Sequence, residues 1–263
     1  MIDTSQSDGA PGASVLGRSL RAFARYPRHS PATAAYLVVL AVDTVVVKRL
    51  LPEATAGRIL HEISTNLDNL PRRPFTSLFG SLLVVDHGTW LDYLLVIGLG
   101  LAVCLALLER RIGTRRALAV VLLGHVGATL ITSVIVAEAT HVGTYPLAIR
   151  HALDYGVSYA SSAAVAAITP LLPRLARPWW VVGAVVYPLT AADWYGRLPD
   201  FTTIGHVSAA LIGLTAAIVM IPAEARRKGG DRAKSKVRAK AGAQAQSQAQ
   251  PQAEAEAEAR VRG

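Results

Sequence analysis

Long apolar runs separated by short polar connections dominate the first 222 residues of the chain. Each run is apolar on all sides, whereas a surface helix of a soluble domain is apolar along one face only. A helix needs about 20 apolar residues to cross the hydrocarbon core of a bilayer. Six segments approach that length: residues 31–51, 89–108, 117–138, 155–173, 178–194 and 202–222. The pattern therefore predicts an all-α, polytopic membrane bundle of six transmembrane helices.

Three regions follow from this pattern. Residues 1–30 are expected to form a cytoplasmic N-terminal segment and residues 31–222 the six-span membrane domain, with a long external loop at residues 52–88. Residues 223–263 are a low-complexity mixture of Ala, Gln, Glu and Lys with little to bury, which predicts a disordered cytoplasmic tail. The fifth span is short and contains Pro188, so its boundaries are the least defined.

Composition and charge agree with a membrane protein and predict its orientation. Hydrophobic residues make up 52% of the chain and charged residues 17%, against about 25% charged residues in soluble domains. Short loops rich in Lys and Arg remain in the cytoplasm. Basic residues gather before the first span, after the second and fourth spans and after the sixth, although the long loop at residues 52–88 also contains three Arg residues. We therefore expect a multi-pass protein of the plasma membrane with both termini in the cytoplasm.

The same features argue against several classes of partner. The net charge of +9 follows from the loop asymmetry, and no segment supplies the folded basic face of a nucleic-acid-binding protein. Cys104 is the only cysteine, which excludes an internal disulfide or a cysteine zinc site. His87, His141 and His151 lie in loops without the spacing of metal ligands. We expect no metal, no cofactor and no nucleic-acid partner.

The segment DYGVSYASS, residues 154–162, begins the fourth span with a G-x-S-x-A run. Ser158 is expected about four residues, or roughly 6 Å, below the outer end of that helix. His206 is expected at the same depth in the sixth span, which runs in the same direction. A histidine inside a membrane is costly and indicates a functional site. Ser158 and His206 are therefore the candidate catalytic residues.

Small residues predict that the fourth and sixth spans lie close together. They recur every four residues in both spans, at Gly156, Ala160 and Ala164 and at Gly205, Ala209 and Gly213. A hydroxyl and an imidazole at hydrogen-bond distance would allow the base to take the hydroxyl proton. Backbone N–H groups at the start of the fourth helix would then hold an oxyanion.

These residues resemble the rhomboid intramembrane serine proteases. The run GVSYA in the fourth span and the run GHVSAALIG in the sixth are similar to that family's G-x-S-G and A-H-x-x-G-x-x-x-G motifs. RPFTSLF, residues 73–79, is similar to its R-x-x-T-S-x-F segment, and LERRIGTRRAL, from residue 108, to its junction between helices two and three. The resemblance covers residues 30–222. It implies that Ser158 is the nucleophile, that His206 is the general base, and that transmembrane segments are cleaved near the outer leaflet without a cofactor.

The sequence also departs from the family pattern. Tyr159 replaces the glycine after the serine and is expected to crowd the site, while the H-x-x-x-N pair of helix two falls on Tyr93 and Ile97. The tyrosine that packs on the histidine falls at Ser162. A second hypothesis is therefore a catalytically inactive rhomboid-like protein that binds or chaperones transmembrane helices. A six-span transporter would show internal repeats, which are not evident, and the sequence does not define an oligomeric state.

Structural interpretations compete with the functional ones at several polar residues. Ser158 would then bond to the carbonyl four residues earlier, as helical serines commonly do. His125 is expected to form a hydrogen bond to a neighbouring helix. Asp154 is expected to be the N-cap of the fourth helix rather than a third member of a catalytic triad. Asp43 and Asp92 are candidates for polar pairs in the interior of the bundle.

Overall fold

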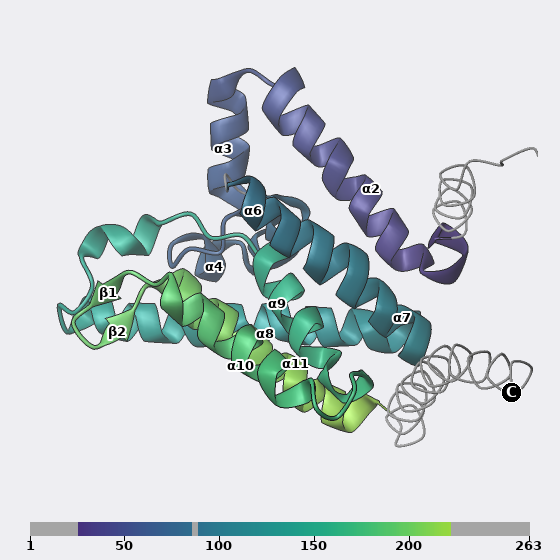
Figure 1. Cartoon of the computed structure of the whole chain (residues 1–263). Helices are drawn as coiled ribbons and strands as arrows, with labels where there is room; N and C mark the ends of the chain where they lie inside the picture. Colours follow the sequence, from purple (N-terminus) through teal and green to yellow (C-terminus); the bar gives the residue numbers. More distant parts are fainter. Residues whose placement is uncertain (1–25, 86–88, 222–263) are drawn as a thin grey trace, which may run out of the picture.

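The computed structural model describes residues 26–85 and 89–221 of the chain (Figure 1). This part is helical apart from one short antiparallel hairpin, in which Trp194 lies opposite Pro199. The elements in chain order are α2 (Pro31–Val45), η1 (Val46–Leu50), α3 (Glu53–Ile63), α4 (Asn69–Arg72), α5 (Pro74–Gly80), η2 (Ser81–Leu83), α6 (Trp90–Tyr93), η3 (Leu94–Leu105), α7 (Ala106–Ile112), α8 (Thr114–His141), η4 (Leu147–His151), α9 (Val157–Ala167), η5 (Thr169–Leu171), α10 (Arg177–Thr190), β1 (Trp194–Tyr195), β2 (Leu198–Pro199) and α11 (Phe201–Met220).

Four of the six expected spans are helices whose length and composition suffice to cross a membrane. They are Pro31–Leu50, Trp90–Ile112, Thr114–His141 and Phe201–Met220. The fourth expected span is a shorter apolar helix, Val157–Leu171, and the fifth is α10 with 14 residues. At 1.5 Å per residue α10 measures about 21 Å, less than the roughly 30 Å of a hydrocarbon core. The helical membrane bundle is confirmed, and the count of six spans remains a prediction.

A single glycine joins two of the long helices. Gly113 has φ +83°, in the left-handed region that glycine enters without steric cost. Its N–H donates to the carbonyl of Glu109, which closes α7, and its own carbonyl accepts from Ala117 in the first turn of α8. The chain therefore turns from α7 into α8 at this single residue.

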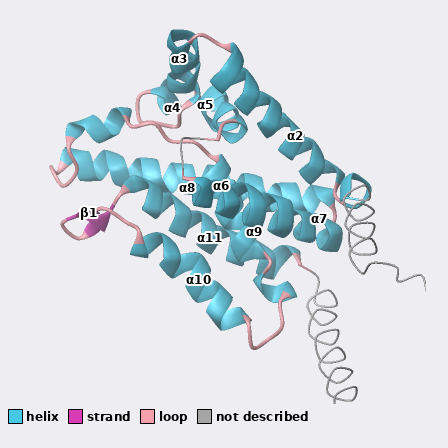
Figure 2. Cartoon of the chain, turned by 45° about the horizontal axis from the view of Figure 1, so that its top comes forward, coloured by secondary structure: helices cyan, strands magenta, loops and turns pink. Residues whose placement is uncertain are grey.

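The core lies where α9 meets η3, α8 and α11 (Figures 1 and 2). The predicted small-residue surfaces are confirmed as the packing surfaces here: Ala160, Ala164 and Ala209 are fully buried. A Cβ at Gly213 would lie 2.3 Å from the Ala163 carbonyl oxygen. Such contacts let helix backbones approach closely. In a lipid environment the hydrophobic effect does not drive helices together, so helices associate through close van der Waals packing of this kind.

Glu109 attaches α2 to the rest of the bundle. Its side chain is buried, and its carboxylate accepts hydrogen bonds from the backbone N–H groups of Ala32 and Thr33 at 3.0 and 2.9 Å. The hydroxyls of Thr33 and Thr114 donate to the same carboxylate. The first N–H groups of a helix lack acceptors within the helix and favour a negative charge. The Glu109 carboxylate thus satisfies the start of α2 while it holds the junction of α7 and α8.

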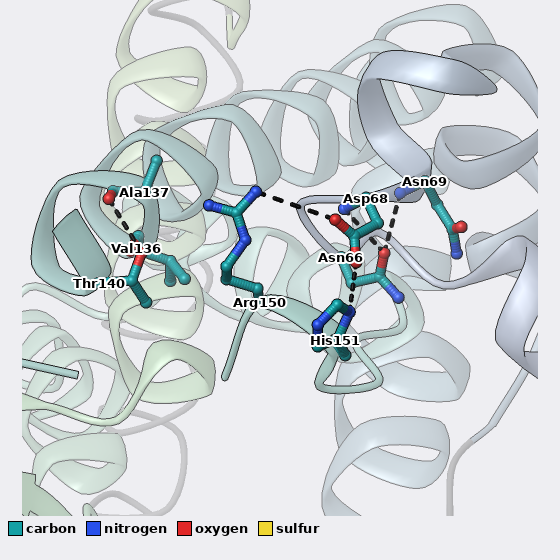
Figure 3. A network of polar contacts seen from close by, with 8 residues as sticks. All are labelled: Asn66, Asp68, Asn69, Val136, Ala137, Thr140, Arg150 and His151. Atoms are coloured by element: carbon teal, nitrogen blue, oxygen red, sulfur yellow. Dashed lines mark hydrogen bonds and ion pairs between the residues drawn. The ribbon is translucent and has the colours of Figure 1, made fainter. Parts of the chain in front are cut away.

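The connection between α2 and α6 packs against the loop that precedes α9. Figure 3 shows part of this contact: the Asp68 carboxylate pairs with His151 and lies 3.9 Å from the Arg150 guanidinium. The Asn66 side chain accepts from the N–H groups of Asp68 and Asn69. Partly exposed ion pairs contribute about 1 kcal/mol at most. Their main effect is to fix the position of the chain that leads into α9.

Candidate functional site

Ser158 and His206 line the same two adjoining cavities. The first has a volume of about 340 Å³ and lies between the start of η3, the chain leading into α9 and the start of α11. The second has a volume of about 570 Å³ and extends between η3, α9, α10 and α11. The residues that border both cavities are Asp92, Val96, Ser158, Thr202 and His206. The two residues that the sequence predicts as a catalytic pair therefore border the same two cavities.

Ser158 is the second residue of α9 and is half-buried. Its Oγ donates to the carbonyl oxygen of Tyr155 at 3.5 Å, the limit at which a hydrogen bond has weakened substantially. Within the described residues no hydrogen bond joins Ser158 to His206. The hydroxyl is thus weakly bonded to the carbonyl three residues earlier in the chain. The structural interpretation had predicted the carbonyl four residues earlier.

His206 lies in the second turn of α11 and packs against an aromatic side chain. The ring of Tyr159 meets it edge-on, with 5.4 Å between the centroids and 81° between the planes. Gly205 makes this arrangement possible, since a Cβ there would lie 2.1 Å from Cζ of Tyr159. T-shaped pairs of this kind are favourable. The Tyr159 ring therefore restricts the orientation of the His206 ring.

The expectation that Tyr159 crowds the site is wrong. Tyr159 is fully buried, packs among Ala128, Ala163 and Ala209, and does not line either cavity. These small residues leave space for its ring between α8 and α11. Tyr159 thus takes the place against the histidine that the family pattern puts at Ser162, and Ser162 instead lines the second cavity.

His125 has the structural role that we expected from the sequence. It is fully buried, and its Nε2 forms a hydrogen bond with the Leu78 carbonyl oxygen at 2.8 Å. The same nitrogen lies 3.4 Å from Ser81 Oγ. Gly156 lies directly against the ring, because a Cβ there would come within 2.0 Å of it. His125 therefore fixes α5 and the start of α9 against α8.

The first residues of α9 contribute backbone N–H groups near the first cavity. The N–H of Gly156 donates to the Ser81 carbonyl oxygen at 3.0 Å. No backbone oxygen in the described part of the chain accepts from the N–H groups of Val157 or Ser158, and both residues line the first cavity. Backbone donors at a helix start suit a developing negative charge.

Asp154 is not the N-cap of α9, contrary to the sequence expectation. Gly156 occupies that position, because the chain stays irregular for two residues beyond Asp154. The Asp154 carboxylate instead accepts from the Thr65 hydroxyl at 3.1 Å, and its N–H donates to Ser64 Oγ at 2.9 Å. Asp154 therefore joins the outer connection to the chain that leads into α9.

The other two aspartates also differ from the expected interior pairs. Asp92 is exposed and forms a capping box with Thr89 at the start of α6, where its carboxylate accepts from the Thr89 N–H and hydroxyl at 2.7 Å. Asp43 is partly exposed and lines a separate cavity of about 550 Å³ beside Lys48 and Glu53. The interpretation as a member of an interior polar pair is therefore wrong for Asp92. Asp92 instead lines both main cavities, a position that the sequence did not indicate.

Asp200 is a site residue that the sequence reasoning missed. It is the N-cap of α11, where its carboxylate accepts from the Thr203 N–H at 3.0 Å and from the Thr203 hydroxyl at 2.7 Å. Burial raises its pKa, but the hydrogen bonds from Thr202, Thr203 and the Asp193 N–H outweigh burial and hold the pKa below its ordinary value. The run Asp-Phe-Thr-Thr before an apolar segment is the signal that predicts this cap.

His141 and His151 do not form part of a metal site with other described residues. Among the described residues, no three His, Cys, Asp or Glu side chains lie close enough to hold a metal ion. His151 pairs with Asp68, and His141 lies at the end of α8. His87 lies outside the described residues.

Comparisons with known proteins identify the family. The sequence profile described as rhomboid-like protein matches residues 25–225, most of the chain. No curated protein and no solved structure matches the chain. The matched range contains all of the described helices, and its helices bring together the serine and histidine on which the resemblance rests. The chain belongs to the rhomboid-like protein family.

Proposed function

We propose that this rhomboid-like membrane protein is an intramembrane serine endopeptidase. Ser158 attacks a peptide carbonyl of a transmembrane segment, and His206 accepts the Ser158 proton and later gives it to the leaving amine. His206 then takes a proton from a water molecule, whose oxygen attacks the acyl-enzyme ester, and returns that proton to the Ser158 oxygen as the carboxylic acid product leaves. The chemistry requires no cofactor.

The observation that carries this proposal is that Ser158 and His206 border the same two cavities. A nucleophile and a base that border one cavity can both reach a substrate bound in it. The mechanism requires rotation of the serine side chain to exchange the weak 3.5 Å bond to the Tyr155 carbonyl for a bond to His206. The N–H groups of Val157 and Ser158 supply donors for the oxyanion on the same side.

The second cavity supports access from the lipid. It separates α10 from η3, and none of the residues of α10 is buried. A helix whose residues are only partly buried is held less firmly than a core helix such as α9 and can move aside. A transmembrane segment entering here would reach Ser158 near the outer end of α9, where an unwound backbone can be cleaved. The proposed partners of the protein are therefore the lipid bilayer and transmembrane substrate proteins.

A second candidate is a catalytically inactive protein that binds or chaperones transmembrane helices. The back-bonded Ser158 hydroxyl and the absence of a hydrogen bond to His206 within the described residues favour it. On this alternative the cavity beside α10 binds a client helix, and Ser158 is an ordinary packing residue.

Labelling by a serine-directed fluorophosphonate probe tests the choice between the two. We expect the purified protein in detergent to be labelled at Ser158, because a hydroxyl with an adjacent base becomes nucleophilic. Gel fluorescence and peptide mass analysis locate the label. The Ser162→Ala variant, which alters a serine on the same cavity wall, should label normally. Labelling that persists in Ser158→Ala would contradict the assignment.

We further propose that six helices span the plasma membrane with both termini in the cytoplasm. The basic residues at the two turns after the second and fourth spans carry this orientation. Reporter fusions after residues 113, 175 and 230 are expected to give cytoplasmic signals, and fusions after 145 and 198 external ones. An external signal at residue 230 would remove one span from the count.

A further inference from the structure

The second cavity has acidic groups at one end and aromatic groups at the other. Asp92, Asp193 and Asp200 line it where α6 and α11 begin and α10 has ended. Trp179 and Trp180 line it at the opposite end, in the first turn of α10. No Lys or Arg is among the described residues that line it, although basic residues outnumber acidic ones 27 to 18 in the chain.

The carboxylates of Asp92 and Asp200 accept their hydrogen bonds from uncharged groups. Asp92 bonds to Thr89 in its own helical turn, and Asp200 bonds to hydroxyl and N–H groups around its cap. Within the described part of the chain, none of the three forms an ion pair with Lys or Arg. They are too dispersed for one metal ion, since no three such groups there are close enough. The combined charge at the edge of a low-dielectric cavity therefore attracts an extended cationic partner.

A second, independent feature points to a peptide as that partner. Ser161 lines the cavity one turn deeper than Ser158 and is 4% exposed. Its hydroxyl lies against Gly100 of η3 and forms no hydrogen bond with the described residues, so it can bond to a polar group that enters the cavity. An acyl chain offers no polar group at this depth. An unwound peptide segment offers backbone N–H and C=O groups.

We propose that the cavity binds a transmembrane segment with Lys or Arg residues at the outer end of its apolar stretch. This inference rests on the proposed function and defines its substrate or client class. The cation lies among Asp92, Asp193 and Asp200, and the apolar stretch runs along Leu99 toward Trp180, whose Nε1 is held by the Val165 carbonyl oxygen at 2.8 Å. Basic residues are concentrated on the cytoplasmic side of membrane proteins. Only a minority of transmembrane segments therefore carry Lys or Arg at the external end, and the proposal selects that minority.

Binding of two matched peptides to the full-length Ser158→Ala variant in detergent micelles tests the inference. Both peptides carry the same apolar stretch of about 20 residues, and one ends in two Lys residues where the other ends in two Glu. Fluorescence anisotropy of labelled peptides measures the affinity. We expect the Lys peptide to bind about tenfold more tightly at low salt, which corresponds to roughly 1.4 kcal/mol. High salt should reduce the difference.

Charge variants show whether the preference for the Lys peptide arises from the carboxylates of this cavity. Asp92→Asn combined with Asp193→Asn should reduce the preference for the Lys peptide to less than about twofold, given the usual size of partly exposed ion pairs. The matched control is Glu53→Gln with Glu138→Gln, which removes two charges that do not line this cavity. Equal affinities of the two peptides for the parent, or equal losses in both variants, would overturn the inference and leave the proposed function standing. Binding of neither peptide would overturn both.

Discussion

Ser158→Ala and His206→Ala are each expected to abolish cleavage of a transmembrane substrate, to the same residual level. A nucleophile and its base act as one unit, so the loss of either removes nearly the whole effect and the double variant is no worse than the single ones. A fall of at least about 10³-fold in the cleavage rate is expected. Cleavage is measured with a fluorescent transmembrane substrate in liposomes that contain the purified protein.

The control for this prediction is Ser162→Ala, one turn below Ser158 on the same cavity wall. It should retain most of the activity, because Ser162 lines the cavity without a role in proton transfer. Ser158→Ala shortens a half-buried side chain, leaves no large cavity, and should fold with an unchanged melting temperature. Full cleavage by Ser158→Ala would refute the mechanism. No cleavage by the parent, together with undiminished capture of transmembrane partners by Ser158→Ala, would favour the inactive binder.

The sequence predicted the features that depend on local pattern. Apolar runs of nearly constant length define helices wherever they occur, and the positions of all six expected spans contain helices in the structure. The spacing of Gly205, Ala209 and Gly213 predicted the contact of α11 with α9. Small residues every four positions form a helix face on which another helix backbone can pack closely. This contact agrees with the position of Ser158 and His206 at the border of the same two cavities.

The features that were missed depend on where a side chain points in three dimensions. Tyr159 was expected in the site because it follows Ser158, yet neighbours along a helix differ by about 100° in direction. The ring therefore turns toward α8 and α11, where Gly205 leaves room for it. Asp154 was assigned to α9 by proximity in sequence, whereas its partners, Ser64 and Thr65, lie about 90 residues earlier. No local pattern indicates such a contact.

Gly205→Leu is expected to damage the protein more than any other single change considered for the bundle. The position faces the fully buried Tyr159 ring, and even a Cβ would lie 2.1 Å from it. The ring cannot move aside, because Ala128, Ala163 and Ala209 enclose it. Overpacking of a closed core costs about 1–3 kcal/mol and sometimes more, and a leucine here should reach the upper end. Thermal unfolding in detergent measures the loss.

A matched pair and a double variant show whether Tyr159 is the cause. Gly183→Leu in α10 is the control, since a Cβ at Gly183 meets nothing within 4 Å, and it should leave the melting temperature nearly unchanged. Combining Gly205→Ala with Tyr159→Ala should cost less than the sum of the two single changes, because removal of the ring makes room for the methyl group. Additive losses would contradict the proposed contact. Since the Tyr159 ring also orients His206, Gly205→Ala should lower cleavage as well as stability. If the protein is instead an inactive binder, Gly205→Leu should weaken capture of transmembrane partners where Ser158→Ala does not.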